Sequence, residues 1–116
     1  MTNFSQLPRT NNLAFVKGDE VSFTEAFAGL DLTGHTLSAG IFNSSIATVT
    51  NVVTPTLSLA TATSGGVVTS TVTVSLSETN TSALATNVRY RWFLRYVTPG
   101  GKTITAVSGA VSCVNP

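Results

Sequence analysis

The sequence predicts an all-β domain, folded as a two-sheet antiparallel sandwich of seven or eight strands. Thr, Ser and Val make up 47 of its 116 residues, and Thr and Val are β-branched types that favour strands over helices. Short alternating runs recur at spacings of about 8 to 14 residues with turn residues between them, as in sandwiches. A chain of 116 residues has room for one such domain.

The first twelve residues are expected to form an extended N-terminal arm, followed by a sandwich spanning residues 13–116. Residues 1–12 are polar and contain Pro8, with Phe4 and Leu7 as isolated large apolar side chains. Such a segment either frays or docks on another surface. We expect Phe4 and Leu7 to anchor it on a partner.

Three strands are expected before residue 43. Glycine-containing turns separate them, and alternating apolar residues mark a buried face in the second and third. Glu25 interrupts the apolar face of the second strand, which places it either at the rim of the core or against a partner. The expected strands are 13–16, 21–27 and 35–42.

The second half of the chain continues this pattern. Ser64-Gly65-Gly66 predicts a hairpin, and Ser77 to Thr86 offers a capped start and room for one or two helical turns. The strictest alternation lies in 88–97. The expected strands are 45–53, one around Leu57 and Leu59, 68–76, 88–97 and 103–114.

The strand 88–97 separates two kinds of side chain. Tyr90, Trp92 and Leu94 are expected to fill the core; an exposed aromatic row would instead indicate a carbohydrate-binding platform. Arg89, Arg91 and Arg95 share the opposite face with Phe93. Because the other aromatic rings point away from the arginines, a nucleic-acid stacking platform is disfavoured, and we expect a solvated or partner-facing surface.

Charge is scarce and unevenly placed. Only 9% of residues are charged and the net charge is +1, which argues against nucleic-acid binding. Residues 1–76 carry −2 and residues 77–116 carry +3. So little charge suits a protein packed against neighbours. An ordinary Thr-rich monomer is the alternative interpretation. No signal peptide or membrane span is recognisable, so we expect no export and no membrane partner.

Catalytic chemistry has no candidate constellation. His35 is the only histidine, and a pairing with Ser44 or Ser45 has no support from spacing. Glu20, Glu25 and Glu78 could supply two carboxylates for glycoside chemistry, but any protein offers as many. We expect no enzyme and no cofactor.

Metal and thiol chemistry is equally weak. Asp19, Glu20 and Asp31 could form a calcium site between loops, but solvated turn residues are the favoured interpretation. The single Cys113 can close no intramolecular disulfide and is expected to be a buried, inert thiol. We therefore expect no metal.

Four short motifs resemble the small immunoglobulin-like modules of tailed bacteriophages. The resemblance spans about residues 12–114 and is nearest to the N-terminal domain of phage baseplate upper proteins, with similar modules in tail-fibre adaptors and head decoration proteins. Glu25 stands where this family would have an apolar residue. The motifs are KGDEVSFT (17–24), LDLTGHTL (30–37), YRWFLRY (90–96) and SGAV (108–111).

This resemblance implies a non-enzymatic structural role in the virion, with other virion proteins as partners and no catalytic residues. Baseplate upper proteins continue into a long distal region, whereas this sequence stops at Pro116. We therefore expect a capsid decoration or cement protein, with a tail or baseplate adaptor as the alternative and a host-surface carbohydrate-binding module as an alternative of another class. The arginines 89, 91 and 95 would meet an acidic partner surface.

Overall fold

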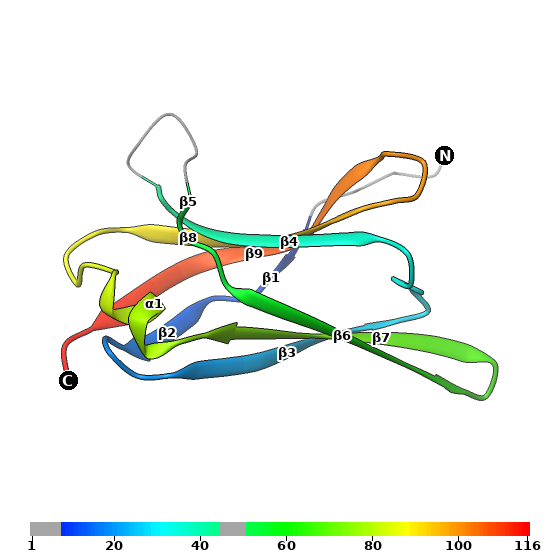
Figure 1. Ribbon diagram of the computed structural model, residues 1–116, viewed down its shortest axis with the longest axis horizontal. Coiled ribbons are helices and arrows are strands. Elements are labelled where there is room, and N and C mark those ends of the chain that lie inside the picture. The colour runs from blue at the N-terminus through cyan, green and yellow to red at the C-terminus, as the bar shows by residue number, and fades with distance from the viewer. Residues whose placement is uncertain (1–7, 45–50) are drawn as a thin grey trace, which may run out of the picture.

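The computed structural model describes residues 8–44 and 51–116, and nearly all of its regular structure is β-strand (Figure 1). The elements are β1 (Arg9–Thr10), β2 (Leu13–Val16), β3 (Val21–Ala28), β4 (Thr36–Asn43), β5 (Asn51–Val53), β6 (Thr56–Ser64), β7 (Val67–Leu76), α1 (Glu78–Ser82), β8 (Tyr90–Val97) and β9 (Thr103–Val114). Phe4 and Leu7 of the expected arm lie outside the described residues.

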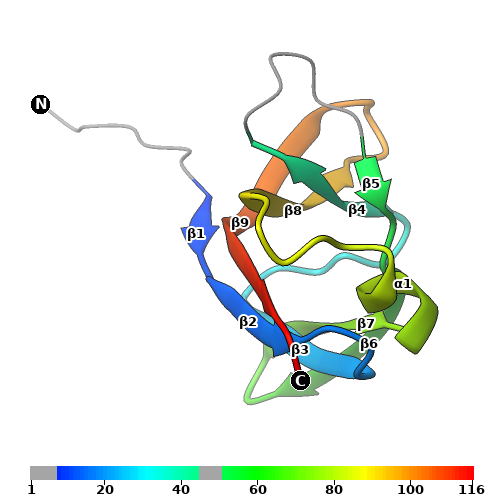
Figure 2. The same cartoon turned by 90° about the vertical axis from the view of Figure 1, so that its left-hand side faces the viewer.

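Two sheets pack face to face, which confirms the predicted all-β sandwich (Figures 1 and 2). One sheet has the order β1-β9-β8-β4-β5, with β2 also paired to β9, and the other has the order β3-β7-β6. The pairings between these strands are antiparallel except those of β1 and β2, which run parallel to β9. The sequence predicts an antiparallel sandwich, and this part of the prediction is wrong at the N-terminal strand, which pairs in parallel.

The N-terminal strand begins earlier than expected. Arg9 lies opposite Val107 and Leu13 lies opposite Val111, so β1 and β2 keep one register along β9. The boundary expected at residue 12 thus moves, because residues from Arg9 onward cover the free edge of β9. An exposed edge strand is a template for unwanted pairing, and this segment blocks it.

The strand order matches the immunoglobulin arrangement. In that fold strands B, E and D form one sheet and C, F and G lie in the other; here β3-β7-β6 corresponds to B-E-D, and β4, β8 and β9 correspond to C, F and G. The hydroxyl of Tyr90, at the start of β8, accepts a hydrogen bond from the Ala85 backbone N–H at 3.0 Å. This contact is the tyrosine corner of such domains.

An aromatic pair stands where antibody domains have their inter-sheet disulfide. That bond joins strands B and F, and its second cysteine follows the corner tyrosine by two residues. Here that position is Trp92, whose ring meets Phe23 of β3 edge-on, with centroids 5.3 Å apart. Trp92 is 1% exposed, so its interpretation as a core residue is confirmed.

The helix closes one end of the core. Ser77 caps α1 with a complete capping box, which confirms the helical turn expected after residue 77. The buried Thr81 hydroxyl accepts from the Gly18 N–H at 3.0 Å and donates to the Asp19 carbonyl at 2.8 Å. These bonds fix the helix to the β2–β3 turn.

A polar cluster closes the sandwich edge between β1 and β3. Glu25 points inward from β3 and its side chain is 7% exposed; it forms an ion pair with Arg9 at 2.7 Å and accepts a hydrogen bond from the Asn11 side chain. Arg9 also donates to the Ala26 carbonyl and lies over the Phe27 ring. Glu25 therefore lies at the rim of the core and is satisfied within the chain.

The backbone at Asn11 turns into the sandwich. Its carbonyl accepts a hydrogen bond from the Trp92 indole N–H at 2.7 Å, and this interrupts the strand between β1 and β2. Gly109 lies directly beneath, and a Cβ there would collide with the Asn11 carbonyl oxygen. Position 109 must therefore be glycine while the N-terminal strand stays docked.

We expect Gly109→Ala to lower the free energy of unfolding by about 1–3 kcal/mol, the usual cost of overpacking. The added methyl group displaces Asn11 and breaks its bond to Trp92. Gly100→Ala is the matched control, because its nearest neighbour would be the Thr98 hydroxyl at 3.9 Å. Urea unfolding measures both variants; equal stabilities would contradict this role of Gly109.

Candidate interaction surface

Arg91 and Arg95 of β8, with Arg89 just before the strand, lie on the outer face of the six-stranded sheet. Tyr90, Trp92 and Leu94 point into the core, so the residues between them point outward. In register, Arg91 lies beside Phe42 of β4, and Phe93 lies between Gly40 of β4 and Ser108 of β9. We call the set Arg89, Arg91, Phe93, Arg95 and Phe42 the arginine face.

Two aromatic rings form the floor of the arginine face. Phe93 is 8% exposed and packs on Phe42 with ring centroids 6.2 Å apart. The Arg95 guanidinium lies over the Phe93 ring at 4.3 Å, and its Nε donates to the Thr105 hydroxyl at 3.2 Å. Arg95 is thus held in place by side chains of its own sheet.

Arg89 and Arg91 are exposed and have no ion pair or hydrogen bond from their side chains within residues 8–44 and 51–116. They line a groove of about 440 Å³ together with Ser44, Ala110 and Ser112. The rest of its lining consists of hydroxyl-bearing and apolar residues and Cys113, and no carboxylate side chain belongs to it. Two guanidinium groups are therefore available to an external acceptor.

The carboxylates of the chain all lie elsewhere. Asp19 and Glu20 lie in the β2–β3 turn, Asp31 follows β3, and Glu78 begins α1. The fifth, Glu25, is engaged by Arg9. Because none of them faces β8, the positive charge of the arginine face has no internal counterion.

The remaining polar candidates do not come together as a reactive site. His35 precedes β4 and Ser44 follows it, so about eight residues of strand, roughly 26 Å, separate them; Ser45 lies outside the described residues. The His35 ring meets Tyr96 edge-on at 5.5 Å, and the Ser44 hydroxyl donates to the Arg89 carbonyl. The hypothetical pairing of His35 with Ser44 is contradicted.

The loop acids are also divided by a strand. Asp31 lies beyond one end of β3, and Asp19 and Glu20 precede the other end. Hydrogen bonds from the Thr33 backbone and side chain lower the pKa of Asp31, which acts as a turn residue. In the described part of the chain, no three His, Cys, Asp or Glu residues are grouped to hold a metal ion.

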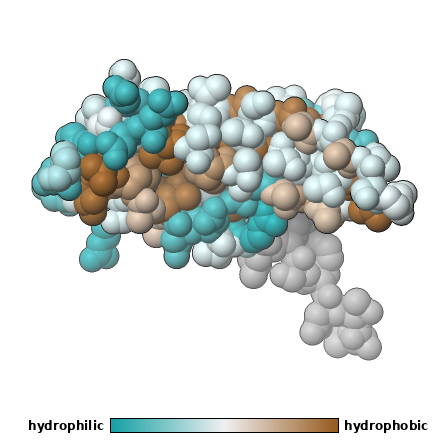
Figure 3. Space-filling model, turned by 90° about the horizontal axis from the view of Figure 1, so that it is seen from below, coloured by the Kyte–Doolittle hydropathy of each residue, from teal (hydrophilic) through white to brown (hydrophobic). Residues whose placement is uncertain are grey.

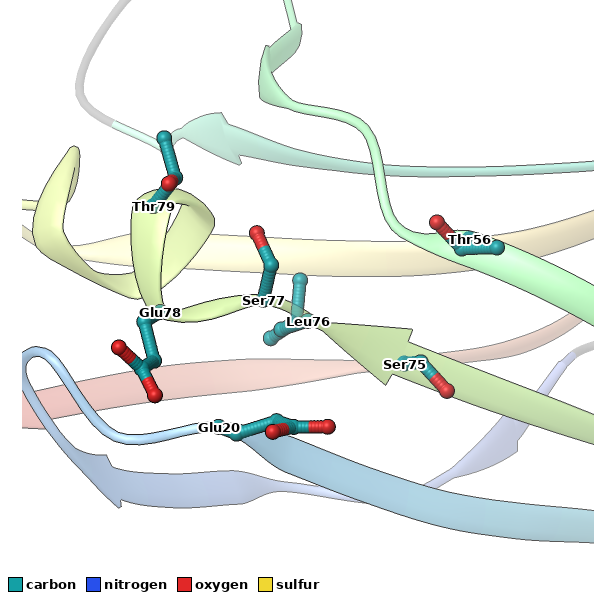
Figure 4. A pocket seen from close by; sticks show the side chains of 7 residues that line it. All are labelled: Glu20, Thr56, Ser75, Leu76, Ser77, Glu78 and Thr79. Atoms are coloured by element: carbon teal, nitrogen blue, oxygen red, sulfur yellow. The ribbon is translucent and has the colours of Figure 1, made fainter.

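The structure brings two of the three glutamates considered for glycoside chemistry, Glu20 and Glu78, to one hollow and leaves Glu25 outside it. Glu20 and Glu78 line an open hollow of about 440 Å³ at the α1 end, with Ser77 and Thr79 beside them, and their carboxylates do not point toward one another (Figure 4). Glu25 lies in the middle of β3, where its carboxylate accepts a hydrogen bond from Arg9. The hollow is otherwise lined by hydroxyl groups and by Leu76.

The single thiol is buried as expected. Cys113 is 4% exposed and belongs to the core cluster. Burial raises the pKa of its thiol, which keeps the group protonated and unreactive near neutral pH.

Sequence reasoning missed Arg9 and Phe42. It treated Arg9 as part of a free arm, yet a glutamate on a buried strand face requires a cation or several donors, and that requirement was the available signal. Phe42 joins the arginine face only through the pairing of β4 with β8, which no local pattern reveals.

No helix within the described residues is long and apolar enough to cross a membrane. No protein-family model matches the chain, and no curated protein matches it either.

Arg9 has an internal partner and Arg91 has none within the described residues, so their substitutions should differ in their effect on stability. We expect Arg91→Ala to change the free energy of unfolding by less than about 0.5 kcal/mol, because no partner is lost. Arg9→Ala should cost about 1–3 kcal/mol, since it leaves the buried Glu25 carboxylate under-satisfied. Urea unfolding of both variants tests this contrast, and a larger loss for Arg91→Ala would show that its side chain serves the fold.

Proposed function

We propose that this protein is a non-enzymatic structural component of a phage virion, a capsid decoration or cement protein that binds neighbouring subunits through the arginine face. The observation that carries the proposal is the pair of exposed arginines, Arg89 and Arg91, without internal counterions on a rigid sheet. Guanidinium groups bind carboxylates through paired, charge-assisted hydrogen bonds. The expected partner therefore presents acidic side chains.

The surroundings of these arginines favour a protein partner. Phe42 and Phe93 give the face an apolar centre, and protein interfaces are enriched in aromatic residues and arginine. The strands behind the face are paired on both sides, since β8 lies between β4 and β9. A rigid surface of this kind loses little conformational entropy on binding.

The assignment to a virion rests on the resemblance of four motifs to tailed-phage modules. The scarcity of charge in the rest of the chain supports a role within a crowded lattice, where most of the surface meets neighbours. In a capsid role, many copies of this small domain would bind equivalent sites on the shell.

A tail or baseplate adaptor is the second candidate, favoured by the resemblance of the four motifs to the N-terminal domain of baseplate upper proteins. The arginine face would serve either location. The copy number per particle distinguishes them, because a shell lattice holds hundreds of copies whereas a tail ring holds about six to eighteen.

We expect Arg91→Glu to weaken binding to particles stripped of this protein by about ten- to hundred-fold, with an almost unchanged melting temperature. Reversal of the charge places a carboxylate against the acidic partner. Lys102→Glu is the matched control, because it makes the same charge change on an exposed turn residue at the far end of β8. Co-sedimentation with the particles measures both variants.

Binding of the wild-type chain should also fall as salt is raised, since exposed charges are screened. Undiminished binding of Arg91→Glu, or an equal loss with Lys102→Glu, would contradict the proposed role of the arginine face.

A further inference from the structure

The three-stranded sheet ends in an open edge. Its order is β3-β7-β6, and within residues 8–44 and 51–116 nothing pairs with the outer edge of β6. This strand is nine residues long, and most of its residues are exposed. Its backbone N–H and C=O groups along that edge are available to another strand.

The usual devices that protect an edge strand are missing from β6. Residues 32–77 contain no Asp, Glu, Lys or Arg, and Pro55 precedes the strand and does not interrupt it. The register between β6 and β7 runs unbroken from Thr56 opposite Ser75 to Ser64 opposite Val67, so no bulge twists the edge away. Natural proteins normally place charges, prolines or bulges at such edges.

The tip of the β6–β7 hairpin is also uncovered on both faces. Residues 60–67 are all exposed, because the hairpin projects beyond the six-stranded sheet (Figure 1). The outward face of the three-stranded sheet carries mainly Thr, Ser and Ala, so much of its surface has intermediate hydropathy and is drawn pale in Figure 3. Nothing in the described part of this chain shields the projecting inner side of the tip.

We propose that β6 pairs antiparallel with β6 of a second copy of this chain, around a two-fold axis midway between the two Ala60 residues. A two-fold axis makes one surface meet itself, and this strand is suited to that. Residues 56–64 hold only Thr, Leu, Ser and Ala, so no like charges face each other and no bulky side chains collide.

The register that follows complements the two halves of the strand. Leu57 and Leu59 point inward and are only partly buried. Around Ala60 they would lie opposite Thr63 and Thr61 of the second copy, on the same face of the joined sheet. The exposed tip of one copy would thus lie beside the partly exposed leucines of the other.

Pairing joins the three-stranded sheets of the two copies into one continuous sheet that crosses both molecules. Because the axis is perpendicular to that sheet, both copies carry their second sheet on the same side, and both arginine faces point the same way. A dimer of this kind could bind a surface through two sites, and linked sites raise the apparent affinity strongly. The pairing itself does not depend on what the arginine face binds.

The test is the mass of the full chain by sedimentation equilibrium up to about 1 mM. We expect a concentration-dependent dimer for the wild type. Ala60→Lys and Ala60→Glu each place two like charges directly opposite each other on the axis, so each variant alone should be monomeric. An equimolar mixture of the two should restore the dimer, which a folding defect could not do.

Ala28→Lys is the matched control, because it adds the same charge to an exposed alanine on β3, the opposite edge of the same sheet; this variant should stay dimeric. A wild type that is monomeric throughout, a dimer that survives Ala60→Lys, dissociation of the Ala28→Lys control, or a mixture that fails to associate would each overturn the proposal.

Discussion

The side chain of Trp92 joins β8 to the other sheet and to the N-terminal strand, neither of which pairs with β8 directly. Its ring packs edge-on against Phe23 of the other sheet, and its N–H holds the carbonyl of Asn11 in the N-terminal strand. The sheets of a sandwich are held together mainly by side chains from their inner faces. An indole at the position of an immunoglobulin cysteine thus takes over the cross-link and adds a polar bond that a disulfide lacks.

Several other features follow from that bond. The inward turn at Asn11 leaves no room for a Cβ at position 109 and brings the Asn11 side chain to Glu25. Glu25 in turn holds Arg9 and is the only carboxylate within the described residues that forms an ion pair. Within the described residues no carboxylate pairs with Arg89, Arg91 or Arg95, so their charge stays on the outside of the sheet. One face of the sandwich is charged and aromatic, while the other is neutral with an open edge.

Local sequence patterns predicted much of this arrangement. Alternation in 88–97 placed Trp92 inside and Arg91 outside because strand geometry repeats every two residues. The parallel N-terminal strand was not predictable, since its partner β9 lies almost a hundred residues away and no local pattern encodes that pairing. The same limit hid the difference between Arg91 and Arg95, which depends on cross-strand neighbours, and the partner of Glu25.

The dependence on Trp92 can be measured by amide hydrogen exchange in Trp92→Phe. Phenylalanine keeps an aromatic contact to Phe23 but has no N–H for Asn11. The amides of Asn11 and Lys17, which bond to Ser108 and Val114, should then exchange much faster, while amides between β3 and β7 keep their protection. Unchanged protection at Asn11 and Lys17, or an equal loss in both sheets, would contradict the account.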